Sequence, residues 1–306
     1  MSSPALHPLV ECLPPPLEQA LGGLRQSIKA LGSTLVAYSG GVDSALVAAI
    51  SAEQLGADAE AVTGVSPALA PHLLREARSQ AAWMGIRHRE VATRELEDPA
   101  YSSNPIDRCY ACKRELHGLL ASLSAGGIQV LDGVNLDDLG DHRPGIRAAR
   151  ERGVVSPLAE QGIDKAAVRQ ISRALGFPWW DKPAQPCLAS RFPYGEPVTA
   201  SRLQRVAAAE DWLRRRGLEQ LRVRCQGATA RLEIPAAQLD DLFSWLPRQE
   251  LVEAFRAFGF VAVSLDLEGL ISGKLNREHG LQPSAPDPLT SDGFRRPDPT
   301  VPGSGR

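Results

Sequence analysis

The residues best suited to chemistry begin near the N-terminus, where the sequence SGGVDS occupies positions 39–44. An apolar run of strand length, 34–38, precedes it, and a segment with helical periodicity follows. A strand, a glycine-rich turn and a helix start together form an anion site, because glycines admit close backbone approach and the N–H groups and helix dipole attract phosphate oxygens. The complete motif therefore favours a phosphate site over the alternative, a turn that binds nothing.

Each residue of this motif has an expected role. Gly40 and Gly41 open the backbone, and Ser39 and Ser44 add hydroxyl donors. Asp43 would repel phosphate directly, so we expect it to hold Mg²⁺ against a pyrophosphate. The loop lacks the Gly-Lys-Ser/Thr of the Walker pattern, which argues against transfer of a γ-phosphate.

The cysteines form a second set of reactive residues: Cys12, Cys109, Cys112, Cys187 and Cys225. Their odd number, in a chain without a visible secretory signal, argues against a disulfide framework. Cys187 lies in a polar loop with Ser190 and Arg191, and a neighbouring cation lowers the pKa of a thiol. We therefore expect these three residues to be catalytic, although a lone cysteine is more often a small buried hydrophobe.

The elements that must position these residues alternate along the first half of the chain. Further strands are predicted at 60–65, 86–91 and 127–131, with a helix at 72–84. Alternation of strands and helices is typical of an α/β fold with a doubly wound parallel sheet, whose ligands bind at the carboxyl ends of the strands.

The second half of the chain changes character after a long connection at 177–199. A helix at 201–216, a hairpin of 221–225 with 228–234, a helix at 251–258 and a strand at 261–265 predict a smaller α+β domain. We expect an N-terminal extension (1–16), a nucleotide domain (17–190), a substrate and oligomerisation domain (191–277) and a disordered, Pro- and Ser-rich tail (278–306).

Composition excludes several classes of protein. The 306 residues are 43% apolar and 23% charged, with a formal net charge of −2. This balance gives no sign of nucleic-acid or membrane binding, and no stretch approaches the roughly 20 apolar residues of a membrane span. We expect a cytoplasmic protein.

Positions 39–44 resemble the PP-loop of the ATP pyrophosphatase superfamily, whose members form an adenylate and release pyrophosphate. The stretch 181–195 around Cys187 looks like the signature of the LarE family. Segments 104–113, 132–138, 147–149, 222–233 and 265–276 also resemble that family, so that the likeness covers roughly residues 17–277. The resemblance implies that the PP-loop binds the β- and γ-phosphates, with Thr63 near the adenine or ribose.

The LarE resemblance also implies a function. Members of this family are sulfur transferases of nickel-pincer cofactor synthesis: ATP adenylates a carboxylate of pyridinium-3,5-biscarboxylic acid mononucleotide, and sulfur then replaces AMP. For such a chain we expect a homo-oligomer that passes its product to other enzymes of the same synthesis.

Two sulfur sources fit the sequence. Cys187 could attack the adenylate and lose its own sulfur, leaving dehydroalanine. Alternatively, Cys109, Cys112 and Cys187 could hold a [4Fe-4S] cluster through three irons, the fourth carrying a removable sulfide. Cys109 and Cys112 could also simply pack in a helix capped by Asp107, whereas a zinc site lacks an obvious fourth ligand.

The implied substrate carries a phosphate and two carboxylates and therefore needs cations. Strand alternation places Arg222 and Arg224 on one face of the hairpin, and arginine suits both kinds of anion. Glu210 and Glu233 match family positions implicated in substrate or metal handling. The alternative is a solvated hairpin held by salt bridges.

Other members of the superfamily are competing interpretations. A tRNA thiolase should show a basic face, which this chain lacks. An amide synthetase with a glutamine-hydrolysing domain would need more chain, and a nucleotide-binding regulator would not need the Cys187 loop. An adenylating sulfur transferase is therefore our prediction.

Overall fold

The computed structural model describes residues 8–124, 126–140, 144–271, 273–274 and 277. They divide into two compact units, with the boundary between residues 204 and 205. The predicted disordered tail lies outside the described residues. No helix within the described ranges is long and apolar enough to cross a membrane.

The first unit contains a parallel sheet in the order β3-β2-β1-β4. Its strands are β1 (Thr34–Ala37), β2 (Ala59–Val65), β3 (Arg87–Ala92) and β4 (Gln129–Leu131). Its longer helices are α1 (Pro15–Leu31), α2 (Val42–Leu55), α3 (Pro71–Met84), α5 (Arg108–Leu123) and α8 (Lys165–Ala174), and its short ones are α4 (Pro99–Ser102), α6 (Pro144–Arg150) and α7 (Pro157–Glu160). The α/β prediction is confirmed.

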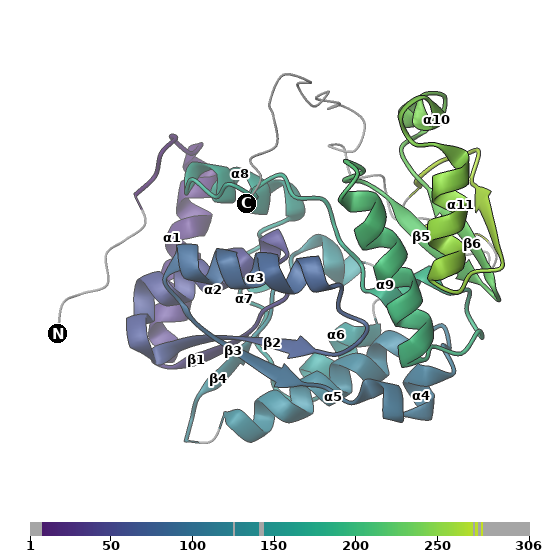
Figure 1. The fold of residues 1–306 in the computed structure, drawn as a ribbon. Coiled ribbons are helices and arrows are strands. Elements are labelled where there is room, and N and C mark those ends of the chain that lie inside the picture. Colours follow the sequence, from purple (N-terminus) through teal and green to yellow (C-terminus); the bar gives the residue numbers. More distant parts are fainter. Residues whose placement is uncertain (1–7, 125, 141–143, 272, 275–276, 278–306) are drawn as a thin grey trace. The chain divides into compact units, whose positions relative to one another are not determined.

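Helices cover both faces of this sheet (Figure 1). Val36 packs into a core cluster with residues of α1, α2, α3 and α8, whereas Leu35 and Ala37 pack into a second cluster with residues of α5 and α6. Successive residues of a strand point to opposite faces, so a strand buried on both sides must be apolar throughout. The continuous apolar run before the phosphate loop is therefore a consequence of double winding.

The second unit is built on a three-stranded sheet in the order β5-β6-β7. Its elements are the part of α9 (Ala200–Arg214) after residue 204, β5 (Arg222–Gln226), β6 (Thr229–Glu233), α10 (Leu242–Trp245), α11 (Arg248–Ala257) and β7 (Ala262–Leu265). β5 and β6 form the predicted hairpin, closed by Gly227 and Ala228, where Gly227 has a positive φ of 56°. β7 runs parallel to β6 because α11 carries the chain back between them.

Candidate functional site

The phosphate loop connects the end of β1 to the start of α2, as predicted. Ser44 Oγ accepts from the backbone N–H of Ser39 at 3.2 Å and donates to the carbonyl of Gly41 at 3.1 Å, and the two serine hydroxyls lie 3.2 Å apart. Gly41 occupies the N-cap position without a capping side chain. The first turn of α2 thus presents backbone N–H groups at the end of the helix that attracts anions.

The loop between β4 and the short 3₁₀ helix η3 (Asp137–Gly140) approaches the phosphate loop closely enough to require glycine. A Cβ on Gly133 would lie 2.6 Å from the backbone nitrogen of Ser44 and 2.8 Å from its Cα. The preceding Asp132 is buried, and burial raises the pKa of its carboxyl group while hydrogen bonds from Ser156 and Val134 oppose the rise. The next turn of the same loop carries Asn135, whose Nδ2 donates to Asp43 Oδ1 at 3.3 Å.

Asp43 makes a second contact that the sequence did not indicate. Lys165 Nζ lies 2.5 Å from Asp43 Oδ2, across 122 residues of chain. Lys165 is the first residue of α8, whose N-cap residue Asp164 accepts from the N–H of Ala167 at 2.7 Å. The cap fixes where the helix begins and hence where the lysine side chain starts.

Thr63, expected near the nucleotide, lies at the carboxyl end of β2 with a buried side chain. Its hydroxyl donates to the carbonyl of Tyr38 at 2.8 Å and lies 2.8 Å from His88 Nε2. Burial lowers the pKa of His88, the largest influence on that group. The Thr63 hydroxyl is therefore engaged within the sheet, and its role at a nucleotide stays a prediction.

The catalytic residues predicted around Cys187 lie together. Half-buried Cys187 immediately precedes a short 3₁₀ helix, η4 (Leu188–Arg191). The buried guanidinium of Arg191 donates through Nη1 to the carbonyls of Pro186 (2.8 Å) and Cys187 (3.3 Å) and to Ser190 Oγ (2.9 Å). These contacts show Arg191 holding the backbone of the loop that presents the thiol.

A polar clamp fixes the segment after η4 against α4 and α5. Asn104, fully buried and with a positive φ of 57°, donates through Nδ2 to the carbonyl of Pro193 at 2.6 Å and accepts through its own carbonyl from Gly195 N–H at 2.8 Å. Arg108 Nη1 donates to Asn104 Oδ1 at 2.7 Å. These hydrogen bonds connect the segment after Cys187 to the start of α5, the helix that carries Cys109 and Cys112.

Cys109 is exposed and Cys112 half-buried, both in the first turns of α5. Burial, followed by the charges of Cys187 and Glu95, raises the pKa of the Cys112 thiol to about 12, and Cys109 adds to the rise. The three cysteines thus share one electrostatic neighbourhood, although no group of three or more metal-binding side chains meets the geometry of a metal site among the described residues. The predicted cap is wrong in one respect: Asp107 occupies the N-cap position, but its side chain makes no capping hydrogen bond.

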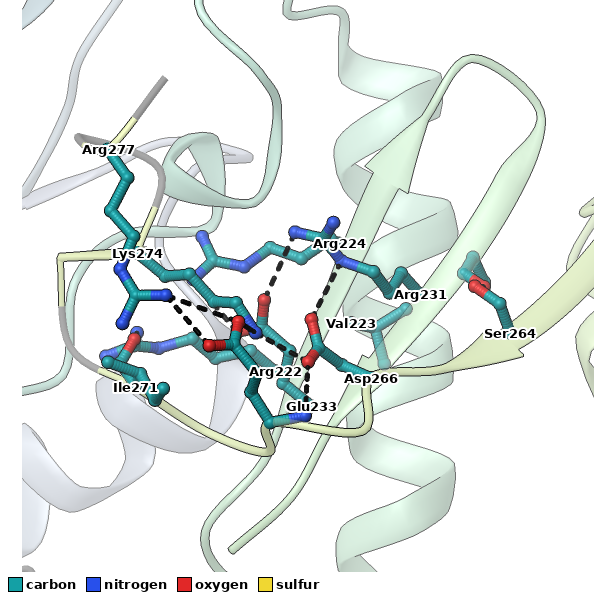
Figure 2. Close-up of polar contacts among 12 residues, drawn as sticks. Arg222, Val223, Arg224, Arg231, Glu233, Ser264, Asp266, Ile271, Lys274 and Arg277 are labelled. Carbon is teal, nitrogen blue, oxygen red and sulfur yellow. Dashed lines mark hydrogen bonds and ion pairs between the residues drawn. The ribbon is translucent and has the colours of Figure 1, made fainter. Parts of the chain in front are cut away.

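The predicted substrate arginines share one face of the second unit's sheet (Figure 2). In the β5–β6 register, Arg222 lies opposite Glu233 and Arg224 opposite Arg231. Arg224 Nη2 lies 3.0 Å from Glu233 Oε2, with both side chains buried, and Arg222 Nη1 donates to the carbonyl of Ile271 at 3.3 Å. The hairpin therefore gathers these charges where alternation predicted them.

Glu210 reaches the hairpin from α9. Its Oε1 accepts from the N–H of Val223 at 3.1 Å, which satisfies a backbone donor on the outer edge of β5. Its Oε2 lies 3.7 Å from Arg214 Nη2, one turn further along the helix. Glu210 thus lies beside β5, next to the predicted substrate arginines.

Two further charged residues join this face from the segment after β7 (Figure 2). Asp266 Oδ2 lies 3.4 Å from Arg231 Nε, and Lys274 Nζ lies 2.5 Å from Asp266 Oδ1. Neither residue has a role predicted from the sequence, because nothing in the local pattern of this segment shows that it returns to the hairpin.

Comparison with known proteins supports the resemblance to the LarE family. No protein-family model matches the chain. It is 55% identical over 263 residues to an uncharacterized protein of Synechocystis, covering 85% of this chain and 98% of that one. It is 34% identical over 253 residues to pyridinium-3,5-bisthiocarboxylic acid mononucleotide synthase of Lactiplantibacillus plantarum, covering 82% of this chain and 91% of that enzyme. An uncharacterized protein of Methanocaldococcus jannaschii is 27% identical, covering 76% and 89% of the two chains.

The parallel sheet, the helices on its two faces and the SGGVDS turn after β1 define a doubly wound protein of the PP-loop class. The extent of its likeness to the Lactiplantibacillus enzyme identifies the group within that class: the chain belongs to the LarE family of sulfur transferases.

Proposed function

We propose that this protein is an ATP-dependent sulfur transferase that converts a carboxylate of pyridinium-3,5-biscarboxylic acid mononucleotide into a thiocarboxylate. The likeness to a bisthiocarboxylic acid mononucleotide synthase is the observation that carries the proposal. The phosphate loop and the Cys187 loop, both in the first unit, provide the two activities that it needs.

The first step activates the carboxylate. Backbone N–H groups at the start of α2 bind the β- and γ-phosphates, and the substrate carboxylate attacks the α-phosphate, forming an acyl adenylate and releasing pyrophosphate. Asp43 fits Mg²⁺, because this ion is commonly held by one or two carboxylates together with substrate phosphates. The bound ion would neutralise phosphate charge, a task that Lys165 shares from its place beside Asp43.

The second step delivers sulfur. The thiolate of Cys187 attacks the acyl carbon and AMP leaves, which forms a thioester. A base then removes the α-proton of Cys187, the Cβ–S bond breaks, and the sulfur stays with the substrate as a thiocarboxylate. The protein keeps dehydroalanine at position 187, lighter by about 34 mass units, the mass of H₂S. Arg191 and Ser190 hold the loop during this exchange.

The hairpin of the second unit provides the cations that a phosphorylated dicarboxylate needs. We assign substrate binding to Arg222 and Arg224, supported by their common face and by their acidic neighbours Glu210 and Glu233. Arginine binds phosphate and carboxylate through paired hydrogen bonds, which gives geometric selectivity as well as attraction.

A cluster-based sulfur source is the second candidate, motivated by the C-x-x-C spacing of Cys109 and Cys112, although no described His, Cys, Asp or Glu side chains are grouped as a metal site. Three thiolates suit a [4Fe-4S] cluster, which would supply a sulfide for transfer. Ligation would have to displace the proton of the half-buried Cys112 thiol. Anaerobic reconstitution with iron and sulfide distinguishes the candidates, because only a cluster gives broad visible absorption that Cys112→Ala abolishes.

The proposed reaction has a direct test. Purified protein is incubated with Mg-ATP and the pyridinium dicarboxylate nucleotide, and AMP, pyrophosphate and thiocarboxylate are measured. We expect all three, with AMP formation dependent on the nucleotide substrate. The proposal is refuted if neither AMP nor pyrophosphate accumulates.

A further inference from the structure

Lys182 contacts the phosphate loop from the segment that leads to Cys187. Its Nζ donates to the carbonyl of Gly40 at 3.1 Å, across 142 residues of chain. The same nitrogen lies 2.5 Å from Glu76 Oε2 on α3. The lysine side chain is 13% exposed and that of Glu76 is 43% exposed, so a mostly buried cation is held at the loop by a more accessible carboxylate.

The geometry around Gly40 fixes where this ammonium lies. Gly40 has a positive φ of 74°, and a Cβ there would lie 3.1 Å from the Cβ of Ala77 on α3. The loop therefore packs directly on the helix that also carries Glu76. An ammonium group has three hydrogens, and the two described contacts account for two of them. The third hydrogen, together with the one that would be released if the accessible Glu76 moved away, can be donated to an anionic ligand in the phosphate loop.

The segment that carries Lys182 is anchored at both ends. At its start, Phe177 and Trp179 pack with Trp83 of α3, with ring centroids 5.1 to 5.4 Å apart, and Lys182 N–H donates to the carbonyl of Trp179 at 3.0 Å. Beyond the cysteine, Leu188 N–H donates to the carbonyl of Ala68 at 2.8 Å. Only the short stretch from Lys182 to Leu188, which includes Cys187, lies between these two anchors.

This stretch is stiff as well as short. Pro183 and Pro186 lie between Lys182 and Cys187, and Lys182 and Gln185 each precede a proline. Proline fixes its own φ and restricts the residue before it to extended conformations. Five residues span at most about 18 Å, so the place where Lys182 is held limits where the thiol can lie.

We propose that Lys182 is a positioning residue that exchanges Glu76 for the phosphates of ATP and thereby sets the position of Cys187. The inference rests on the proposed function, since it assumes ATP in the phosphate loop and a reactive thiol at 187. Sulfur delivery would then follow nucleotide binding, because the thiol reaches its working position only when phosphate holds Lys182.

The test measures how fast iodoacetamide alkylates Cys187 in the full chain, with and without the magnesium complex of α,β-methylene ATP, an analogue that cannot form an adenylate. Mass spectrometry separates the Cys187 peptide from those of exposed Cys12 and Cys109. Calorimetry sets a nucleotide concentration that saturates each variant. We expect nucleotide to change the Cys187 rate at least fivefold in the native protein and less than twofold in Lys182→Met.

Two further variants complete the test. Lys29→Met removes an exposed lysine of α1 and should keep the full response. Glu76→Gln removes the competing carboxylate from an accessible side chain, so half of the response should require two to five times less nucleotide. The Glu76→Gln variant still tests the inference if Lys182→Met does not fold or does not bind nucleotide.

A Lys182→Met response equal to the native one, no response in the native protein, or an unchanged nucleotide requirement in Glu76→Gln would overturn the inference. The proposed function is judged separately by AMP and thiocarboxylate formation. A Lys182-dependent response in a protein that makes no AMP would sink the function and leave the phosphate contact standing.

Discussion

Lys165 Nζ lies 2.5 Å from Asp43 Oδ2, which brings the first residue of α8 to the phosphate loop. Both side chains are partly exposed, at 31% and 21%, so the pair contributes little to stability but is accessible to a nucleotide. The lysine thereby places a positive charge where pyrophosphate would develop negative charge during adenylation.

We therefore expect Lys165→Met to lower the rate of AMP formation about 100-fold, the typical cost of losing one preorganised charged donor. Its thermal midpoint should stay close to that of the native protein. Steady-state kinetics of pyrophosphate release measure the effect, with Lys29→Met as the control. A rate within threefold of the native one would show that Lys165 takes no part.

Gly133 is expected to be essential to the phosphate loop. In Gly133→Ala the new methyl would lie 2.6 Å from the backbone nitrogen of Ser44, so the start of α2 must shift. ATP affinity, measured by calorimetry, should fall at least tenfold. The matched control is Gly118→Ala in α5, where a Cβ meets nothing within 4 Å and alanine favours the helix. Equal affinities in the two variants would contradict the close approach.

The buried pair of Arg224 and Glu233 should show strong coupling. Removing Arg224 leaves the buried Glu233 carboxylate with Arg231, whose Nη2 lies 3.4 Å from Oε1, and breaking one buried ion pair typically costs about 3 to 5 kcal/mol. We expect Arg224→Met to destabilise the second unit by about that amount, and Arg224→Met combined with Glu233→Met to be more stable than the single variant. Hydrogen exchange of the β5 amides measures both. Additive losses would indicate that the charges do not interact.

His117 should make the protein sensitive to acid. Its side chain is buried on α5, and burial, with a smaller effect of Lys113, lowers its pKa from 6.5 to about 3. The folded state therefore holds the neutral imidazole, whereas the unfolded chain takes up a proton below pH 6.5. Stability is retained above that pH and lost as the pH falls from 6.5 towards 3, at about 1.4 kcal/mol per unit.

The comparison that isolates this effect is between the native protein and His117→Leu. From pH 7.5 to pH 5, urea unfolding should show the native protein losing about 2 kcal/mol more than the variant. Parallel curves for the native protein and His117→Leu would show that the histidine is not held neutral.

The sequence was sufficient for features that depend on local pattern. The apolar run before Ser39, the glycine turn and the alternating arginines of β5 each encode their own geometry, and all three lie where they were expected. Lys165 and Lys182 reach the phosphate loop from more than 120 residues away. Such contacts cannot be predicted from the periodicity of the sequence, because they result from the order of the strands and from the packing of α8 and α3 on the sheet.

Asp107 shows a different limit. A residue of a good capping type stands at the start of α5, yet its side chain makes no cap bond. The neighbouring structure is dominated by Asn104 and Arg108, whose buried contacts hold the turn. The backbone geometry at the start of α5 is therefore determined by tertiary contacts, whereas the capping preference of aspartate alone predicts a side-chain cap.

The substitution Cys187→Ala separates adenylation from sulfur transfer. The native protein and the variant are each given Mg-ATP and the pyridinium dicarboxylate nucleotide, and AMP and thiocarboxylate are counted in the same sample. We predict that the variant forms AMP at a rate within threefold of the native one but makes no thiocarboxylate. Thiocarboxylate formed by the variant would contradict both sulfur sources, because each of them requires the thiol at position 187.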